Sequence, residues 1–174
     1  MHYPVVIHYL FSSPAHNYFT RPKFEKGNAP VIHHRELSLE ASKGIAGDRF
    51  EQGLYPITFF SLEVAELMEK ELGKSVDISD FRRNIIVTGI NLCELIGHRF
   101  SIGAVTFEGI AHCNPCPWMN AVIGKGAYAV MKGRGGLRAR VIGGGKLGLG
   151  RQQLQCDISL VKTPITALTQ RRIP

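Results

Sequence analysis

The amino-acid sequence predicts a mainly β fold, a closed or partly open β-barrel with few peripheral helices. Many short apolar or alternating segments are separated by glycine turns, and only one segment has clear helical periodicity. Strands and helices do not alternate regularly, which disfavours a doubly wound sheet. The 174 residues contain no internal repeat and no linker, so we expect one domain over residues 1–174.

The predicted strands are apolar or alternating runs that end at glycine, proline or polar residues. We expect them at residues 5–11, 31–39, 55–60, 84–88, 100–108, 137–142 and 154–161. Between them, glycine-rich or polar segments predict turns at residues 43–50, 91–97 and 143–150. The polar segment 16–30 contains prolines and a glycine, and we expect it to be a long loop shaped by function.

The one predicted helix covers residues 61–72. Ser61 is suited to the N-cap position and Gly73 to the helix end. One face of this helix is apolar and consists of Val64, Leu67, Met68 and Leu72.

Composition favours an anionic partner. The formal net charge is +7, from 21 Lys and Arg against 14 Asp and Glu. This charge is spread along the chain without a basic run, which disfavours nucleic acid as a partner.

No segment approaches the ~20 apolar residues of a membrane span, and we identify no signal peptide. The four cysteines do not resemble a secreted disulfide framework, so we expect free thiols in the cytoplasm.

The most informative motif is Cys113-Asn114-Pro115-Cys116, followed by Pro117. A single C-x-x-C is compatible with half of a zinc site, a redox pair, one functional thiol, or two buried apolar cysteines. Proline on both sides of Cys116 favours a stiff, shaped loop. We predict no structural zinc and no disulfide in the cell, because a closed zinc site needs four ligands and the cytoplasm is reducing.

Three basic segments are candidates for holding a phosphate group. The segment 132–140 combines Arg134 and Arg138 with three glycines, whose N–H groups can face an anion, but a simple glycine hairpin is equally compatible. Arg82 and Arg83 enter a strand and can clamp a phosphate or lie on the surface. Arg49 follows Asp48, which can orient it, or the two belong to an ordinary turn.

Taken together, five segments resemble the MOSC domain, named for the C-terminal part of molybdenum cofactor sulfurases. In order, they are residues 44–49, 82–89, 95–103, 113–116 and 133–139, and they place the motif-bearing core at about 30–150. The resemblance implies a barrel related to the pyruvate kinase β-barrel domain. One departure is Arg151 after Gly150, where the family usually has an aspartate.

The resemblance also implies a function. Cys116 matches the cysteine that carries sulfur or ligates molybdenum, and the protein is expected to bind molybdopterin-type cofactor through Arg49, Arg83, Asn84, Arg134, Gly135, Gly136 and Arg138. Arg83 and Arg134 are expected to line one pocket with Cys116. The expected role is sulfur carriage or cofactor-dependent reduction of N-hydroxylated compounds, with a cysteine desulfurase or a redox partner. Pyridoxal phosphate is not expected in this chain. The alternative is a non-catalytic binding module for a phosphorylated metabolite or nucleic acid.

Overall fold

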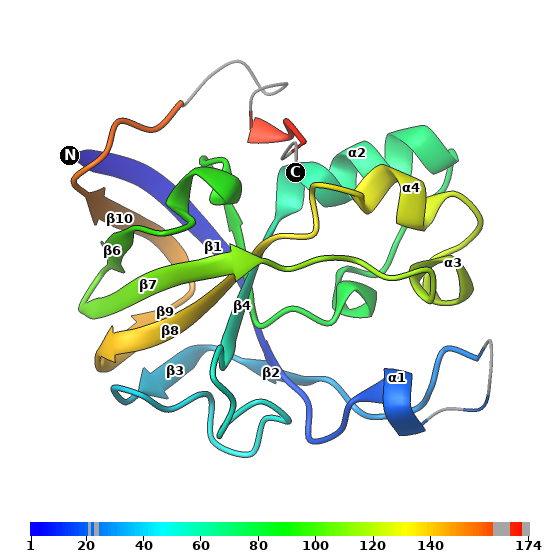
Figure 1. Ribbon diagram of the computed structural model, residues 1–174, viewed down its shortest axis with the longest axis horizontal. Coiled ribbons are helices and arrows are strands. Elements are labelled where there is room, and N and C mark those ends of the chain that lie inside the picture. Colours follow the sequence, from blue (N-terminus) through cyan, green and yellow to red (C-terminus); the bar gives the residue numbers. More distant parts are fainter. Residues whose placement is uncertain (21, 23–24, 162–167, 172–174) are drawn as a thin grey trace.

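The barrel expected from the sequence is present in the computed structural model, which describes residues 1–20, 22, 25–161 and 168–171 (Figure 1). One continuous sheet has the strand order β10-β6-β7-β8-β4-β5-β1-β2, and β10 also pairs with β1, which closes a ring. The ring strands are β1 (His2–Ser12), β4 (Ile57–Ser61), β5 (Ile85–Thr88), β6 (Arg99–Ile102), β7 (Val105–His112), β8 (Leu137–Gly143) and β10 (Gly150–Cys156).

All strand pairs in the ring are antiparallel except β4 and β5. A parallel pair needs a crossover, and α2 (Leu62–Leu72) and the short helix η1 (Ile78–Phe81) lie between these two strands in the sequence. The helix prediction is confirmed. The Ser61 hydroxyl accepts the Val64 N–H, and Gly73 ends the helix at φ 65°.

Two cores lie on the two sides of β4. Phe59 points into the barrel and packs edge-to-face against Phe100 and Phe107, with ring centroids 5.7 and 5.1 Å away. Phe60, the next residue, points outward and stacks on Phe81 at 4.4 Å. Because neighbouring side chains of a strand point to opposite faces, β4 contributes both to the barrel interior and to the core of a helical layer.

The helical layer lies to one side of the barrel (Figure 1). Its members besides α2 and η1 are α1 (Asn17–Thr20), α3 (Met119–Val122) and α4 (Ala127–Met131), whereas η2 (Leu92–Leu95) packs on the barrel and contributes Leu92 and Leu95 to its core. The sequence reading missed α3 and α4, because helices of four or five residues are too short for periodicity to reveal. No helix in the described ranges is long and apolar enough to cross a membrane.

Three strand predictions need correction. Residues 100–108 form two strands, because the chain turns at Gly103, which has φ 58°. Residues 31–39 divide into β2 (Ile32–His34) and β3 (Glu36–Leu39). The expected turn at 143–150 contains β9 (Gly145–Gly148), which pairs with β3 in a separate two-stranded sheet. The last strand was expected at residues 154–161, but the observed strand, β10, starts at Gly150 and ends at Cys156.

Candidate functional site

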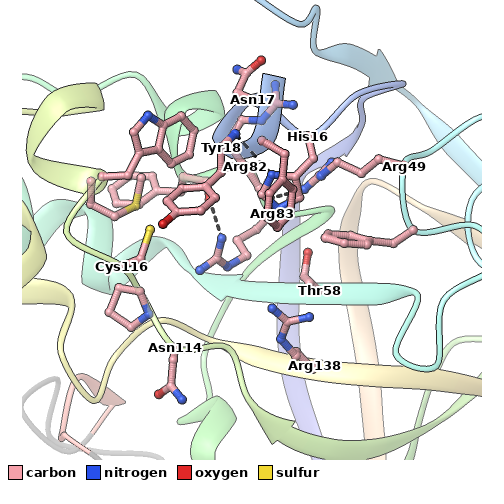
Figure 2. Close-up of a pocket in the computed structure, with 16 residues that line it drawn as sticks. His16, Asn17, Tyr18, Arg49, Thr58, Arg82, Arg83, Asn114, Cys116 and Arg138 are labelled. Atoms are coloured by element: carbon pink, nitrogen blue, oxygen red, sulfur yellow. Dashed lines mark hydrogen bonds between the residues drawn. The ribbon is translucent and has the colours of Figure 1, made fainter. Parts of the chain in front are cut away.

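A cavity of about 360 Å³ lies where loops from the barrel meet the helical layer (Figure 2). Its walls come from segments far apart in the sequence. The N-terminal segment supplies His16 and Tyr18, the loop before β4 supplies Arg49 and Phe50, and the loop before α3 supplies Cys116. The remaining lining residues are Asn17, Phe19, Thr58, Phe81, Arg82, Arg83, Asn114, Pro115, Trp118, Met119 and Arg138.

The cavity is strongly cationic. Four arginines line it, and no acidic side chain is among the described lining residues. Asp48 is the nearby counter-charge, and its Oδ1 lies 3.2 Å from Arg49 Nη1 in a pair that is almost fully buried. The pKa of Arg49 is lowered to about 10, chiefly by burial and also by the charges of Arg82 and Arg83, while Asp48 opposes this lowering. The site therefore carries several guanidinium charges that one carboxylate does not balance.

Two of these arginines hold the walls together. Arg82 donates to the Ala29 carbonyl at 3.2 Å, and to the Ser13 hydroxyl and the Ala15 carbonyl, both at 2.7 Å. These contacts hold in place a strap, residues 13–20 and 25–29, of which residues 16–19 line the cavity. Arg82 itself adopts φ 57°, an unusual conformation for a residue with a side chain. Its placement by the surrounding contacts offsets that cost.

Arg83 fixes the cysteine loop. Its Nε donates to the Gly135 carbonyl at 3.0 Å and its Nη1 to the Phe81 carbonyl at 2.7 Å. Its Nη2 reaches the Cys113 carbonyl at 3.5 Å. As expected from the sequence, Arg83 shares the cavity with Cys116, but most of its donors already serve backbone carbonyls.

Arg138 differs from these two. It lies on β8, and its guanidinium makes no hydrogen bond or ion pair with any residue that the structure describes, while its Cζ lies 5.9 Å from the centre of the Phe50 ring. Arg49 lies over the same ring at 4.7 Å and donates one hydrogen bond to the Arg82 carbonyl at 2.8 Å. Arg138 and the remaining donors of Arg49 are therefore the groups best able to bind an anion.

Cys116 approaches the cavity from the side opposite Arg138 (Figure 2). It is half-buried, and its carbonyl accepts the Met119 N–H at 3.0 Å at the entry to α3. Cys113 is buried at 3% exposure, and its N–H donates to the Gly136 carbonyl at 2.8 Å. The two cysteines thus have different environments, and only Cys116 lines the cavity. Both are free thiols in this structure.

Arg134 does not line the cavity, so the expectation that it shares a pocket with Cys116 is wrong. Gly133 and Gly136 have φ 77° and 97°, and between these turns Arg134 extends toward the C-terminal segment. Its Nε donates to the Thr169 carbonyl at 2.6 Å and its Nη1 to the Val130 carbonyl at 3.0 Å.

Gly135 and Gly136 are also absent from the cavity lining, and they permit close packing. The Gly135 N–H donates to His112 Nε2 at 3.0 Å, so it does not face an anion in the cavity. A Cβ at Gly135 would overlap the Cys113 carbonyl oxygen, and one at Gly136 would overlap the Phe59 carbonyl oxygen. These glycines therefore bring β8 against β4 and the cysteine loop.

Asn84 is a buried residue that connects the strands next to the cavity by hydrogen bonds. It is 1% exposed and does not line the cavity. Its Oδ1 accepts the Thr58 N–H at 3.0 Å and the Thr58 hydroxyl at 2.8 Å, and its Nδ2 donates to the Phe11 carbonyl at 3.1 Å. It links β1, β4 and the start of β5.

The sequence reading missed the aromatic side of the cavity. Tyr18 and Trp118 contact each other with ring centroids 6.2 Å apart, and the Trp118 indole N–H donates to the Glu25 carbonyl at 2.8 Å. His16 packs against Phe50, with centroids 5.5 Å apart. The sequence does predict that segment 16–30 is a loop shaped by function, but this prediction does not identify which of its residues line the cavity.

Comparison with known proteins identifies the family. The MOSC domain model matches residues 47–152. The YuaD protein from Bacillus subtilis is 14% identical, covers 88% of this chain and 96% of its own, and has a TM-score of 0.67. YiiM from Escherichia coli is 18% identical, covering 100% of this chain and 79% of its own with a TM-score of 0.63. YiiM from Geobacillus stearothermophilus is 14% identical, with coverages of 91% and 75% and a TM-score of 0.63. No curated protein sequence matches the chain. The match over residues 47–152 places this chain in the MOSC domain family.

Proposed function

We propose that this protein binds a phosphate-bearing molybdenum cofactor in the cavity, with Cys116 as the thiol that ligates the metal or carries sulfane sulfur. One observation carries the proposal: a half-buried thiol shares a cavity with four arginines and no acidic lining residue in the described chain. A neutral substrate gives no reason for such charge, whereas a phosphate group does.

The donor set fits this type of ligand. Thiolate is a soft ligand of the kind that molybdenum accepts, and Cys116 is the one cysteine that lines the cavity within the described residues. Arg138 and Arg49 would hold the phosphate group, and the rings of Tyr18 and Trp118 offer flat apolar surface for a planar pterin. Arg82 and Arg83 would act as positioning residues for the strap and the cysteine loop.

When bound, the cofactor supplies the oxygen-atom or sulfur chemistry, and the chain supplies binding and orientation. The proposed reaction is reduction of N-hydroxylated compounds or transfer of sulfane sulfur through Cys116. A redox partner or a cysteine desulfurase, respectively, is the proposed protein partner in the cytoplasm.

The test is analysis of molybdenum and pterin in protein purified from a host that makes the cofactor. We expect both in wild type at near-stoichiometric amounts. Arg138→Met removes one charged contact worth about 1.5–3 kcal/mol and should weaken pterin retention by about 10- to 150-fold. Arg134→Met is the matched control and should retain the pterin, because Arg134 lies outside the cavity. Cys116→Ser should lose metal or persulfide, whereas Cys93→Ser should not.

Two outcomes contradict the proposal. Wild type that contains neither molybdenum nor pterin, but binds a phosphorylated metabolite or nucleic acid, would establish the binding-module alternative. Equal loss of pterin in Arg134→Met and Arg138→Met would show that the cavity is not the binding site. Persulfide labelling of Cys116 after incubation with a cysteine desulfurase then separates sulfur carriage from reduction.

A further inference from the structure

His16 occupies the junction between the aromatic and the cationic sides of the cavity. Its ring lies 4.8 Å from the Phe19 centroid and 5.5 Å from the Phe50 centroid. Phe50 is also the ring over which the guanidiniums of Arg49 and Arg138 lie. The imidazole therefore lines the same cavity as the two arginines best able to bind an anion.

A hydrogen bond indicates the tautomer of the neutral ring. His16 Nδ1 lies 3.2 Å from the Tyr18 backbone N–H, which donates to it. A nitrogen that accepts a hydrogen bond carries no proton, so the neutral ring carries its proton on Nε2. Uptake of a second proton takes place on Nδ1 and breaks this contact. Tyr18 lies in the exposed first turn of α1, where water can take the place of Nδ1.

The charges around His16 come from several elements. Arg49 lies in the loop before β4, Arg82 follows η1, and Arg138 lies on β8. Burial is the largest cause that lowers the pKa of His16 to about 4; the charges of Arg49, Arg82 and Arg138 contribute to this lowering in that order, and a backbone hydrogen bond opposes it. Within the described chain, two acidic groups lie beside this cluster: Asp48 is paired with Arg49, and Asp80, which acts on Arg82, is paired with Lys26. At neutral pH the protein therefore holds a neutral imidazole among cations.

An oxyanion beside Arg49 and Arg138 changes this balance. Its negative charge opposes the guanidinium field that disfavours the imidazolium, so protonation becomes easier. By thermodynamic reciprocity, a proton on His16 strengthens the binding of the anion by the same factor. No electron transfer or bond cleavage is needed, and the proton comes from solvent.

We propose that His16 is a proton-linked anion contact, which takes up a proton when a phosphate-type oxyanion binds beside Arg49 and Arg138. This inference rests on the proposed function, because both use the same arginines. It adds that the ligand is bound together with a proton, and that affinity for an oxyanion rises as the pH falls. It also enlarges the imidazolium fraction of His16 in the ligand-bound cavity as the pH falls toward 5, where the ring can donate a proton.

The probe for the experiment is sulfate, which does not change its own charge between pH 5 and pH 8. Nitrogen NMR of the labelled imidazole follows the titration of His16 in the wild-type protein. The titration is carried out once in sodium sulfate and once in sodium chloride of equal ionic strength. We expect sulfate to raise the midpoint of the His16 titration by about one pH unit, equivalent to a tenfold gain in affinity on protonation. In parallel, sulfate affinity should rise about twofold from pH 7 to pH 5 in wild type, as a shift of the midpoint from about 4 to about 5 requires. It should stay nearly constant in His16→Gln.

His98→Gln is the matched control, because His98 is exposed and does not line the cavity. It should keep the wild-type pH dependence. If sulfate binds but the His16 midpoint does not move, or if His16→Gln keeps the pH dependence, this inference is wrong while the arginine site stands. If sulfate does not bind to wild type, or binds equally well to Arg138→Met, both the inference and the proposed phosphate site are wrong. The NMR measurement uses wild type, so the test does not depend on the folding of a variant.

Discussion

Replacement of Gly135 by alanine tests whether the glycine-rich segment exists for close packing. An alanine Cβ at this position would overlap the Cys113 carbonyl oxygen and lie 2.9 Å from Pro115 Cδ and 3.1 Å from the Cys113 carbonyl carbon. Two of these three atoms belong to the backbone, so no side-chain rotation relieves the overlap. The cysteine loop must move away from β8 instead.

The expected cost follows from these contacts. Overpacking of a tight interior costs about 1–3 kcal/mol. Displacement of the loop also strains two hydrogen bonds, one from the Gly135 N–H to His112 and one from Arg83 to the Gly135 carbonyl. Each contributes about 0.5–1.5 kcal/mol to the unfolding free energy. We therefore expect Gly135→Ala to lose about 3 kcal/mol of unfolding free energy, which for a domain of this size lowers Tm by about 6–12 °C.

Urea unfolding followed by the fluorescence of Trp118, the single tryptophan, measures this loss directly, with circular dichroism as a second probe of two-state behaviour. Gly148→Ala is the control, because the nearest atom to a Cβ there is 3.9 Å away. It should stay within about 0.5 kcal/mol of wild type. A Gly135→Ala variant as stable as Gly148→Ala would refute the packing argument and revive an anion-binding role for this segment.

Three further outcomes are expected. Asn84→Ala leaves the Thr58 N–H and the Phe11 carbonyl without a buried partner and should cost about 2–4 kcal/mol in urea unfolding; a loss below 1 kcal/mol would contradict this. Ser61→Ala removes the N-cap of α2 and the hydrogen bond that the Ser61 hydroxyl donates to Glu63, and should cost about 1–2 kcal/mol, whereas Ser61→Thr keeps the hydroxyl and should retain most of that stability. The pKa of His16 is lowered to about 4, so the unfolded chain binds a proton below about pH 6.5 that the folded protein does not; stability is full above that pH and is lost as the pH falls toward 4. After allowance for solvent exposure, this loss is about 1–2 kcal/mol, and a plot of unfolding free energy against pH should be flatter over this range in His16→Gln.

The sequence predicted the fold class well because local signals agree with the tertiary structure. The helix over 61–72 has its cap and its terminal glycine in the sequence, and both are present in the structure; of the expected apolar face, Val64 and Met68 are buried, whereas Leu67 and Leu72 are only partly buried. Strand boundaries were less accurate where one glycine decides them. Residues 100–108 alternate throughout, but the buried positions change from even numbers to odd numbers at the turn at Gly103, which separates β6 from β7.

The site was only partly predictable for a physical reason. A sequence shows which side chains carry charge, but not which backbone carbonyls they satisfy. Arg83 and Arg138 look equivalent in the sequence, yet most donors of Arg83 bind carbonyls, while Arg138 contacts the Phe50 ring. Arg134 was misplaced because two turns at glycines direct it away, and the direction of such turns depends on φ values that the sequence does not specify.

Closure of the barrel has a consequence for synthesis of the protein. The pair that closes the ring joins His2 to Gln155, so the first strand meets its partner only near the end of the described chain. During translation, β1 therefore leaves the ribosome long before β10 and exposes one strand edge until the last strand emerges. Contacts of such long range also slow folding. We expect nascent chains stalled before residue 150 to depend on chaperones, and release of the last strand to end that dependence in one step.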